Sequence, residues 1–222
     1  MKNDGADFNG MAVKVMPLRV FPRQSVGGGY TYDTQQAVLY AAGLPNNSGT
    51  IAPTTTPIKV INLSLKGGGV ETCGVYADVV AQGITVVAAA GNDENEYPGL
   101  VSYPASCPNV ISVGATDSLD QRASYSQRNA WVDIAAPGGS EIDSDADSQP
   151  DYVPAWANNT EFAGLPGTSM ASPHVAGAIA LMYAIDNNMS PSTVNTYLQA
   201  GYLTDDIGAS GYDTSFGYGR LN

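Results

Sequence analysis

A run of small residues with two serines and a histidine holds the best candidate for chemistry in this chain. The run reads GTSMASPHVAG and extends from Gly167 to Gly177. A hydroxyl in a tight turn at a helix N-terminus is a candidate nucleophile, because free N–H groups and the positive end of the helix dipole favour negative charge there. Ser169 is therefore a candidate nucleophile. The alternative is that Ser169 and Ser172 only cap the helix.

The segment after this run is predicted to be a buried helix. Its apolar residues recur at the helical spacing i, i+4, i+7, at positions 175, 179, 182 and 183. The first helical residue stays open at this point, because Ser172-Pro173 is also a typical N-cap followed by the first helical position.

The rest of the chain alternates between strand-like and helix-like segments. Predicted strands cover 11–21, broken near Pro17, and 59–65, 84–90 and part of 103–115, and predicted helices cover 33–42, 71–82 and 190–198. Such alternation implies parallel pairing with right-handed crossovers. The sequence thus predicts an α/β three-layer fold.

Two of the predicted strands end in polar residues. Ser64-Leu65 ends one strand and Gly91-Asn92 ends the next. Ligands of open parallel sheets bind beyond the carboxyl ends of the strands, so these residues are candidates for a site. A Gly-Asn pair is also a common turn, which is the alternative for Asn92.

The GTSMASPHVAG run resembles the nucleophile motif of the subtilisin-like serine proteases over eleven consecutive residues. The resemblance implies that Ser169 is acylated and that Asn92, with the Ser169 backbone N–H, stabilises the negative oxygen of the tetrahedral intermediate. The run VINLSL, ending at Ser64-Leu65, is similar to the strand of that family that pairs with an extended peptide. The implied fold is subtilisin-like, with a mainly parallel central sheet.

The same resemblance implies a pocket for a substrate side chain. Its walls would be the segment AAAGN, which contains Ala89 and Gly91, and the turn that contains Ala105. These small residues predict an open pocket that tolerates large apolar side chains. Lys66 departs from the family, in which glycine is usual, and a side chain there could narrow the groove or change its preference.

A serine nucleophile needs a general base, and the chain contains one histidine. His174 follows Ser169 by five residues, which in a helix is about 500° of rotation and about 7.5 Å of rise. We therefore expect a packing or hydrogen-bonding role for His174. The Asp and His motifs of the family would precede Met1, and nothing in residues 1–62 resembles them. Residues 1–222 are predicted to be one domain, the C-terminal part of a catalytic domain without its N-terminal portion, and inactive alone.

An acidic segment interrupts the resemblance before the nucleophile run. Carboxylates alternate with other residues there, as Ca²⁺ ligands from one loop often do. The candidate ligands are Asp143, Asp145, Asp147, Gln149 and Asp151. A full EF-hand is excluded, because Ser148 and Pro154 stand where its glycine and bidentate glutamate are required. The alternative is an acidic surface loop without a cation.

Cys73 and Cys107 are the two cysteines of the chain, and their spacing is not that of a zinc site. A disulfide between them would tie a helix to the pocket wall and indicate an oxidising compartment. Two buried free thiols are the alternative.

Composition restricts the partners. With 21 acidic and 9 basic side chains the net charge is −12, which argues against nucleic acid and anionic membranes. The sequence has no apolar run long enough to span a membrane, and residues 1–5 are too polar for a signal peptide. We expect either a cytosolic protein or a chain that begins after its secretory segment, and the resemblance favours secretion.

The leading hypothesis is a secreted serine endopeptidase whose substrate is a peptide or protein. Its Asp and His would come from an upstream segment or a second chain, and a propeptide could cover the site. The alternative is an inactive relative that binds peptides or calcium. An α/β-hydrolase esterase is excluded, because Ala171 replaces the second glycine of the G-x-S-x-G motif.

Overall fold

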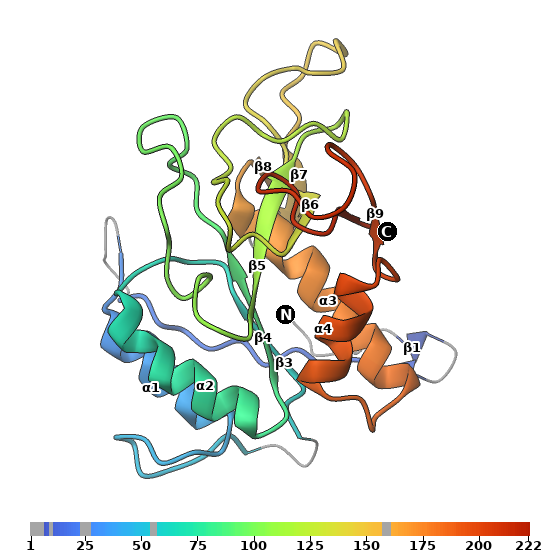
Figure 1. The fold of residues 1–222 in the computed structure, drawn as a ribbon. Coiled ribbons are helices and arrows are strands. Elements are labelled where there is room, and N and C mark those ends of the chain that lie inside the picture. Colours follow the sequence, from blue (N-terminus) through green and yellow to red (C-terminus); the bar gives the residue numbers. More distant parts are fainter. Residues whose placement is uncertain (1–6, 9–10, 23–27, 54–56, 157–160) are drawn as a thin grey trace.

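The computed structural model describes residues 7–8, 11–22, 28–53, 57–156 and 161–222 (Figure 1). The polar amino end, residues 1–5, lies outside the described residues. Within them, a six-stranded sheet has the order β3-β4-β5-β6-β10-β9. The strands are β3 (Val60–Leu63), β4 (Thr85–Ala89), β5 (Val110–Thr116), β6 (Ile134–Pro137), β9 (Thr204–Asp205) and β10 (Arg220–Leu221).

Four neighbouring pairs of this sheet are parallel, and β9 is antiparallel to β10. Strands β4 and β5 are buried along their whole length, as expected of central parallel strands covered on both faces. The register aligns Leu63 with Ala88 at the carboxyl ends of β3 and β4. The predicted strands over 59–65, 84–90 and 103–115 are therefore confirmed.

Helices cover both faces of the sheet (Figure 1). Helices α1 (Thr31–Ala41) and α2 (Cys73–Ala81) lie on one face, with the short 3₁₀ turn η1 (Val70–Thr72) before α2, and α3 (Thr168–Ile185) and α4 (Pro191–Gln199) lie on the other. Alternate side chains of β4 point to opposite faces, so Val86 joins the core under α1 and α2 and Val87 joins the core under α3. The predicted three-layer α/β arrangement is confirmed.

The helices follow the local signals in the sequence. Pro191 opens α4, and the Ser190 side chain accepts a hydrogen bond from the Thr193 N–H as its N-cap. For α3, the open question is answered in favour of the earlier start, because the helix begins at Thr168 and contains Pro173. The apolar residues predicted for its buried face include Val175 and Ile179, which are 1% exposed.

The predicted strand over residues 11–21 was wrong for most of its length. Only β2 (Met11–Ala12) is a strand, and it pairs with β1 (Asp7–Phe8) instead of joining the large sheet. Residues 13–20 have no regular structure, and Val15 is 67% exposed. Apolar, β-branched composition marks a segment that can become a strand, but it does not provide the neighbouring strand that must pair with it.

A second two-stranded sheet leads into the nucleophile run. It consists of β7 (Val153–Trp156) and β8 (Phe162–Leu165), which pair in antiparallel fashion. The acidic segment precedes β7 and forms the yellow loop at the top of Figure 1. The chain therefore passes directly from the acidic loop, through this hairpin, to Gly167 at the start of α3.

Candidate active site

Ser169 lies in the first turn of α3, against the carboxyl end of β3. The Ser169 Oγ donates to the backbone carbonyl of Ser64 at 3.3 Å, and the Ser64 Oγ donates to the backbone carbonyl of Ser169 at 2.7 Å. The second bond has a local cause. Residue 173 would normally donate its N–H to the Ser169 carbonyl, but Pro173 has no N–H. The Ser64 hydroxyl satisfies that carbonyl and so fixes β3 to the nucleophile turn.

Asn92 is attached to the same turn from the carboxyl end of β4. Its side-chain Oδ1 accepts hydrogen bonds from the Thr168 N–H at 2.9 Å and from the Thr168 hydroxyl at 2.8 Å. The Thr168 Oγ1 in turn accepts from the Gly91 N–H at 3.2 Å, and Thr168 is fully buried. These bonds determine the orientation of the Asn92 amide, because both bonds to Thr168 use its oxygen.

The Asn92 Nδ2 consequently points past Gly167. A Cβ built on Gly167 would lie 3.3 Å from this nitrogen, and Gly167 has a φ of +149°, which an L side chain rarely adopts. Within the described part of the chain, neither the Asn92 Nδ2 nor the Ser169 backbone N–H has a hydrogen-bond acceptor. Two free donors thus lie beside one partly exposed serine hydroxyl.

The side chains of Ser172 and Asn62 support the group formed by Ser64, Asn92, Thr168 and Ser169, which is called the corner from here on. The Ser172 Oγ, fully buried one turn into α3, donates to the Asn62 Oδ1 at 2.6 Å. The Asn62 Nδ2 donates to the Ser64 Oγ at 3.0 Å. The Ser64 hydroxyl is therefore oriented by one bond that it accepts and one that it donates.

The predicted pocket walls lie around this corner, with less exposure than expected. Ala89 is 3% exposed and Ala105 is 1% exposed, and Gly91 is also buried, whereas Leu65 is half-buried. The Gly67 N–H donates to the Tyr103 carbonyl at 2.8 Å, which connects the segment after β3 to the opposite wall. The structure brings these segments together, and their roles in substrate binding stay predictions.

Lys66 and Asp93 form an ion pair. It joins the segment after β3 to the segment after β4. Lys66 follows Leu65 directly, and Asp93 follows Asn92 directly. The exposed fractions of the two side chains are 48% and 26%. No hydrogen-bond or ionic partner other than this pair occurs for either charged group among the described residues.

His174 is exposed and turned away from Ser169. Its Nδ1 lies 2.8 Å from the Met170 carbonyl, and since a carbonyl can only accept, this nitrogen carries the proton. The hydrogen-bonding role expected of His174 agrees with this contact. His174 is the one histidine of the sequence.

Cys73 and Cys107 form a disulfide with an S–S distance of 2.00 Å. The bond joins the first residue of α2 to the turn that follows Ala105. Of the two alternatives left open by the sequence, the structure therefore has the disulfide.

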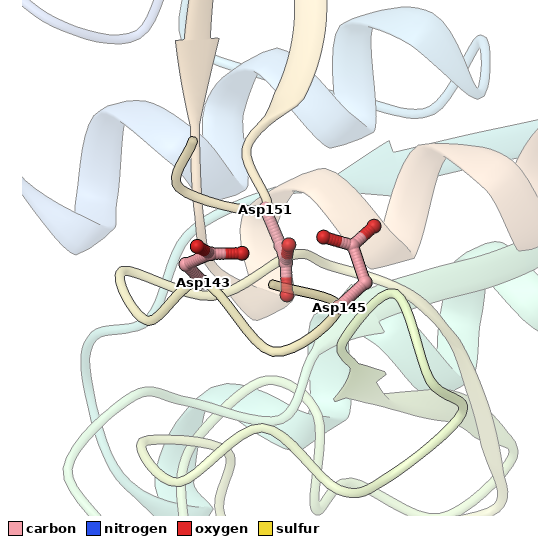
Figure 2. A group of neighbouring side chains, drawn as sticks. All are labelled: Asp143, Asp145 and Asp151. Atoms are coloured by element: carbon pink, nitrogen blue, oxygen red, sulfur yellow. The ribbon is translucent and has the colours of Figure 1, made fainter. Parts of the chain in front are cut away.

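Three of the five predicted metal ligands come together in the acidic loop. One carboxylate oxygen from each of Asp143, Asp145 and Asp151 lies within 4.8 Å of the other two, and Figure 2 shows the three side chains facing one another. Asp147 is not part of this group of carboxylates, and Gln149 lies in the same loop as a predicted ligand. Their backbone N–H groups instead donate within the loop, that of Asp147 to the Asp143 Oδ1 at 3.0 Å and that of Gln149 to the Asp147 Oδ1 at 2.8 Å.

Charges within the loop act on one another. The hydrogen bond from the Asp147 N–H lowers the pKa of Asp145, but partial desolvation and the neighbouring carboxylates outweigh it, and the net shift is upward. Partial desolvation raises the pKa of Asp151, but hydrogen bonds from Ser144 and Ser118 give a net downward shift. The loop thus concentrates negative charge that a cation would neutralise.

One surface hollow adjoins the loop that follows Asn92. It has a volume of about 350 Å³ and is lined by Glu94, Pro98, Gly99, Arg128, Asn129 and Thr214. Glu94 is 5% exposed and is held by the Arg128 Nε at 2.7 Å and the Gly99 N–H at 2.9 Å. Burial raises the pKa of Glu94, but these bonds and the Arg128 charge outweigh it, so the net shift is downward. This carboxylate is satisfied by the protein and has a structural role.

Comparison with known proteins agrees with this geometry. The model of the subtilase family matches residues 1–219. The chain belongs to the subtilase family. It is 38% identical over 192 residues to an extracellular protease of Xanthomonas campestris, and this match covers 84% of the chain and 31% of that protein. It is 36% identical to a thermophilic serine proteinase of Bacillus sp. strain AK1, over 99% of the chain and 47% of that protein.

Solved structures give the same result for the fold. A protease from Pseudoalteromonas arctica superposes with a TM-score of 0.72 at 29% identity, over 88% of this chain and 57% of that one. A cold-adapted subtilisin-like serine proteinase superposes with a TM-score of 0.64 at 27% identity, over 89% of this chain and 61% of that one. The subtilase chain therefore spans between 31% and 61% of the length of these four proteins.

Three side chains of this subtilase corner were not identified as site residues from the sequence. Thr168 orients Asn92, and Ser172 and Asn62 orient Ser64. A signal for the first contact was present, because Thr168 precedes the nucleophile at the helix start. Pro173 was a signal for the Ser64 contact, since a proline four residues after Ser169 leaves the Ser169 carbonyl without its helical donor.

None of the described helices is both long and apolar enough to cross a bilayer.

Proposed function

We propose that this chain supplies the nucleophile, the oxyanion hole and the peptide-binding strand of a subtilisin-like serine endopeptidase. The observation that carries the proposal is the attachment of Asn92 to the residue before Ser169, through two hydrogen bonds to Thr168. Through this contact Asn92, which follows β4, is attached to the residue next to Ser169 at the start of α3. A general base and its aspartate would come from a segment upstream of residue 1 or from a second chain.

In this mechanism the Ser169 Oγ attacks the carbonyl carbon of the scissile peptide bond. The proton of its hydroxyl passes to the histidine supplied from outside residues 1–222. The carbonyl oxygen becomes negatively charged and accepts hydrogen bonds from the Asn92 Nδ2 and the Ser169 N–H. Collapse of the intermediate breaks the C–N bond, the histidine returns its proton to the leaving amine, and an ester remains on Ser169, which water then hydrolyses.

The peptide would lie along residues 64 and 65 as an added strand. Leu65 is half-buried there, and the backbone beyond β3 has no strand partner among the described residues. The residue on the acyl side of the scissile bond, P1, would extend between this segment and the segment from Ala89 to Asn92.

A fluorophosphonate probe tests the nucleophile in the protein that carries this chain together with its upstream segment. Labelling should occur in the wild type and be lost in Ser169→Ala. The matched control is Ser192→Ala on α4, which should label like the wild type. Equal labelling of the Ser169→Ala protein would exclude Ser169 as the nucleophile.

The oxyanion hole is tested by Asn92→Ala, which should lower kcat and leave KM nearly unchanged. The expected loss is about 10²- to 10³-fold, the magnitude known for removal of one such donor in subtilisin. A matched change from asparagine to alanine at Asn188, after the C-terminal end of α3, should leave kcat unchanged.

A second candidate function is peptide binding without cleavage. It is favoured by the single histidine, which is bound to the Met170 carbonyl and faces away from Ser169. Hydrolysis of a casein substrate separates the two functions. A longer gene product that binds peptides, contains no further histidine near Ser169 and hydrolyses nothing would support the binding protein.

We also propose that the acidic loop binds Ca²⁺ through Asp143, Asp145 and Asp151. Calcium takes oxygen ligands at about 2.3–2.6 Å, so ligand atoms on opposite sides of one ion are about 4.6–5.2 Å apart, and the 4.8 Å limit within the group fits this. Each carboxylate accepts backbone bonds and keeps spare lone pairs for a cation. The ion would supply positive charge to a loop of like charges and take no part in bond cleavage.

Thermal unfolding and titration calorimetry test this site together. Calcium should raise the Tm of the wild type and give a binding isotherm, and Asp145→Asn should weaken both effects. Asp78→Asn on α2 is the matched control and should respond to calcium like the wild type. A wild-type Tm that is the same in calcium and in chelator would contradict the proposal.

Secretion is part of the same proposal. The disulfide between Cys73 and Cys107 fits an oxidising compartment, and relatives named extracellular proteases cover most of the chain. Detection of the protein in culture medium, with both cysteines protected from alkylation until reduction, would support it. Retention inside the cell with two free thiols would contradict it.

A further inference from the structure

The ion pair between Lys66 and Asp93 is a feature of this chain that the proposed protease function does not use. Lys66 stands where the resemblance to the subtilases leads us to expect glycine. Its ammonium group contacts the Asp93 carboxylate across 27 residues of sequence. The two residues belong to different segments, one after β3 and one after β4.

These two segments begin side by side and flank the nucleophile. The register of β3 and β4 ends with Leu63 beside Ala88. Beyond that pair, one segment reaches Ser169 through Ser64, and the other reaches Thr168 through Asn92. Lys66 lies two residues after the first contact, and Asp93 lies one residue after the second. The ion pair therefore joins the two segments again just beyond the corner that holds Ser169.

Backbone contacts limit how far either segment can move. The Gly67 N–H donates to the Tyr103 carbonyl at 2.8 Å, and the Tyr97 N–H donates to the Asp93 carbonyl at 2.7 Å. The position of each charged side chain is thus fixed at its backbone, while its charged end is partly exposed, at 48% for Lys66 and 26% for Asp93. A ligand side chain between the two segments could reach either charge.

We propose that the Lys66–Asp93 pair crosses the entrance of the P1 site and makes it select uncharged side chains. This inference rests on the proposed protease function. In the intact pair each charge neutralises the other, so a charged P1 side chain finds no free partner and must give up its own hydration. Removal of one member leaves the other unpaired beside the ligand, and the site then attracts a P1 side chain of the opposite charge.

The test uses three peptides that differ only in a C-terminal Phe, Lys or Glu, with free carboxylates like those of a cleavage product. Their affinities for the chain are measured by titration calorimetry. The wild type should bind the Phe peptide most tightly. In Lys66→Met the affinity for the Lys peptide relative to Phe should rise about fivefold, and in Asp93→Asn the relative affinity for the Glu peptide should rise by a similar factor of about five.

Two further variants make the test specific. The double substitution Lys66→Asp with Asp93→Lys restores a pair with the charges exchanged and should return the preference to that of the wild type. Asp120→Asn breaks a different ion pair, to Arg220, and should leave all three affinities unchanged. A thermal unfolding curve for each variant verifies that it is folded.

The outcomes separate this inference from the protease proposal. If the Phe peptide binds but neither single variant changes the ranking of the charged peptides, the pair does not control selectivity, and the protease proposal stands. If none of the three peptides binds the wild type, this inference is overturned, whereas the protease proposal is decided separately by the labelling of Ser169.

Discussion

The corner around Ser169 and the acidic loop over residues 141–151 are both built from short polar side chains, yet they are held in opposite ways. Apart from the bond between Asn62 and Ser64, the hydrogen bonds in the corner join residues that are 76 to 110 positions apart in sequence. Most of those in the loop join residues two to seven positions apart, although Asp151 also accepts from Ser118 and, through its backbone carbonyl, from the Ser140 N–H. The corner therefore exists only when β3, β4 and α3 are assembled, whereas the loop keeps its shape through local bonds and repels itself through its charge.

The largest change in stability is expected from removal of the disulfide that joins α2 to the turn containing Cys107. The double substitution Cys73→Ala with Cys107→Ala opens a loop of sequence separation 34. It should lower the free energy of unfolding by about 3–4 kcal/mol, because the unfolded chain regains the entropy of that loop. Urea unfolding measures the loss, and adding reductant to the wild type should reproduce it.

A loss below about 1 kcal/mol would show that α2 and the turn at Cys107 are held by packing alone. The long-range character of the corner would then come entirely from its hydrogen bonds and its core.

Asp133 is a largely buried carboxylate beside the sheet, and we expect it to destabilise the fold at neutral pH. Burial raises the pKa of Asp133 to about 6, although a hydrogen bond from the Ser112 N–H acts in the opposite direction. The folded state thus favours the protonated form, so the stability from this group is present below pH 4 and is lost as the pH rises through 6. Asp133→Asn should remove that loss and stabilise the protein at pH 7 by about 3 kcal/mol.

The pH dependence is the deciding measurement for Asp133. The difference in unfolding free energy between variant and wild type should grow from pH 4 to pH 7 and then level off. Asp78→Asn on the exposed side of α2 should show no such growth. A difference that is constant over this range would mean that the folded and unfolded states share the same Asp133 pKa.

Thr168→Val removes the side chain that joins Asn92 to the nucleophile turn. Valine keeps the shape but leaves the buried Gly91 N–H without its acceptor and removes one of the two hydrogen bonds to the Asn92 Oδ1, while the bond from the residue 168 N–H remains. The expected cost is about 1–3 kcal/mol of unfolding free energy, together with a fall in kcat in the active protease. Thr196→Val on α4, whose hydroxyl bonds within its own helix, is the matched control.

A Thr168→Val protein with normal kcat would show that Asn92 keeps its orientation without Thr168. In that case the corner would depend less on long-range side-chain bonds than the comparison states.

The smallest effect is expected in the acidic loop. In chelator, Asp143→Asn should change the unfolding free energy by less than about 0.5 kcal/mol, because the loop is exposed and the lost hydrogen bonds are offset by weaker repulsion. In calcium the difference should grow, since the wild type alone keeps all three carboxylates. An equal difference under both conditions would remove the distinction between the two regions.

The sequence predicts local elements better than contacts between segments that are far apart in the chain. The segments that end at Leu63 and Ala89 were predicted as strands, because buried parallel strands are apolar throughout. Ser169 and Asn92 could be named as candidates because each is adjacent to such an element. Their connection through Thr168 could not be derived from spacing alone, since it depends on how α3 lies across the sheet.

The wrong strand prediction concerned a contact that the local sequence pattern does not contain. Residues 13–20 have strand composition, but a strand needs a paired neighbour, and none lies beside them among the described residues. In the acidic loop the five ligands suggested by alternation stay a prediction. Asp143, Asp145 and Asp151 lie close together there, and Ala146 and Ser148 turn the chain between them with positive φ values of 62° and 72°. Backbone turns of this kind carry little signature in a run of Asp, Ser and Ala.

Ser64 and Ser169 each donate a hydroxyl hydrogen bond to the other's backbone carbonyl, and this has a consequence for selectivity. One residue belongs to the segment on which a peptide would lie, and the other is the proposed nucleophile, so a peptide that displaces the first would also tilt the second. Poorly fitting peptides would then be penalised in turnover more than in affinity, and discrimination would be exerted while the bond is being cut.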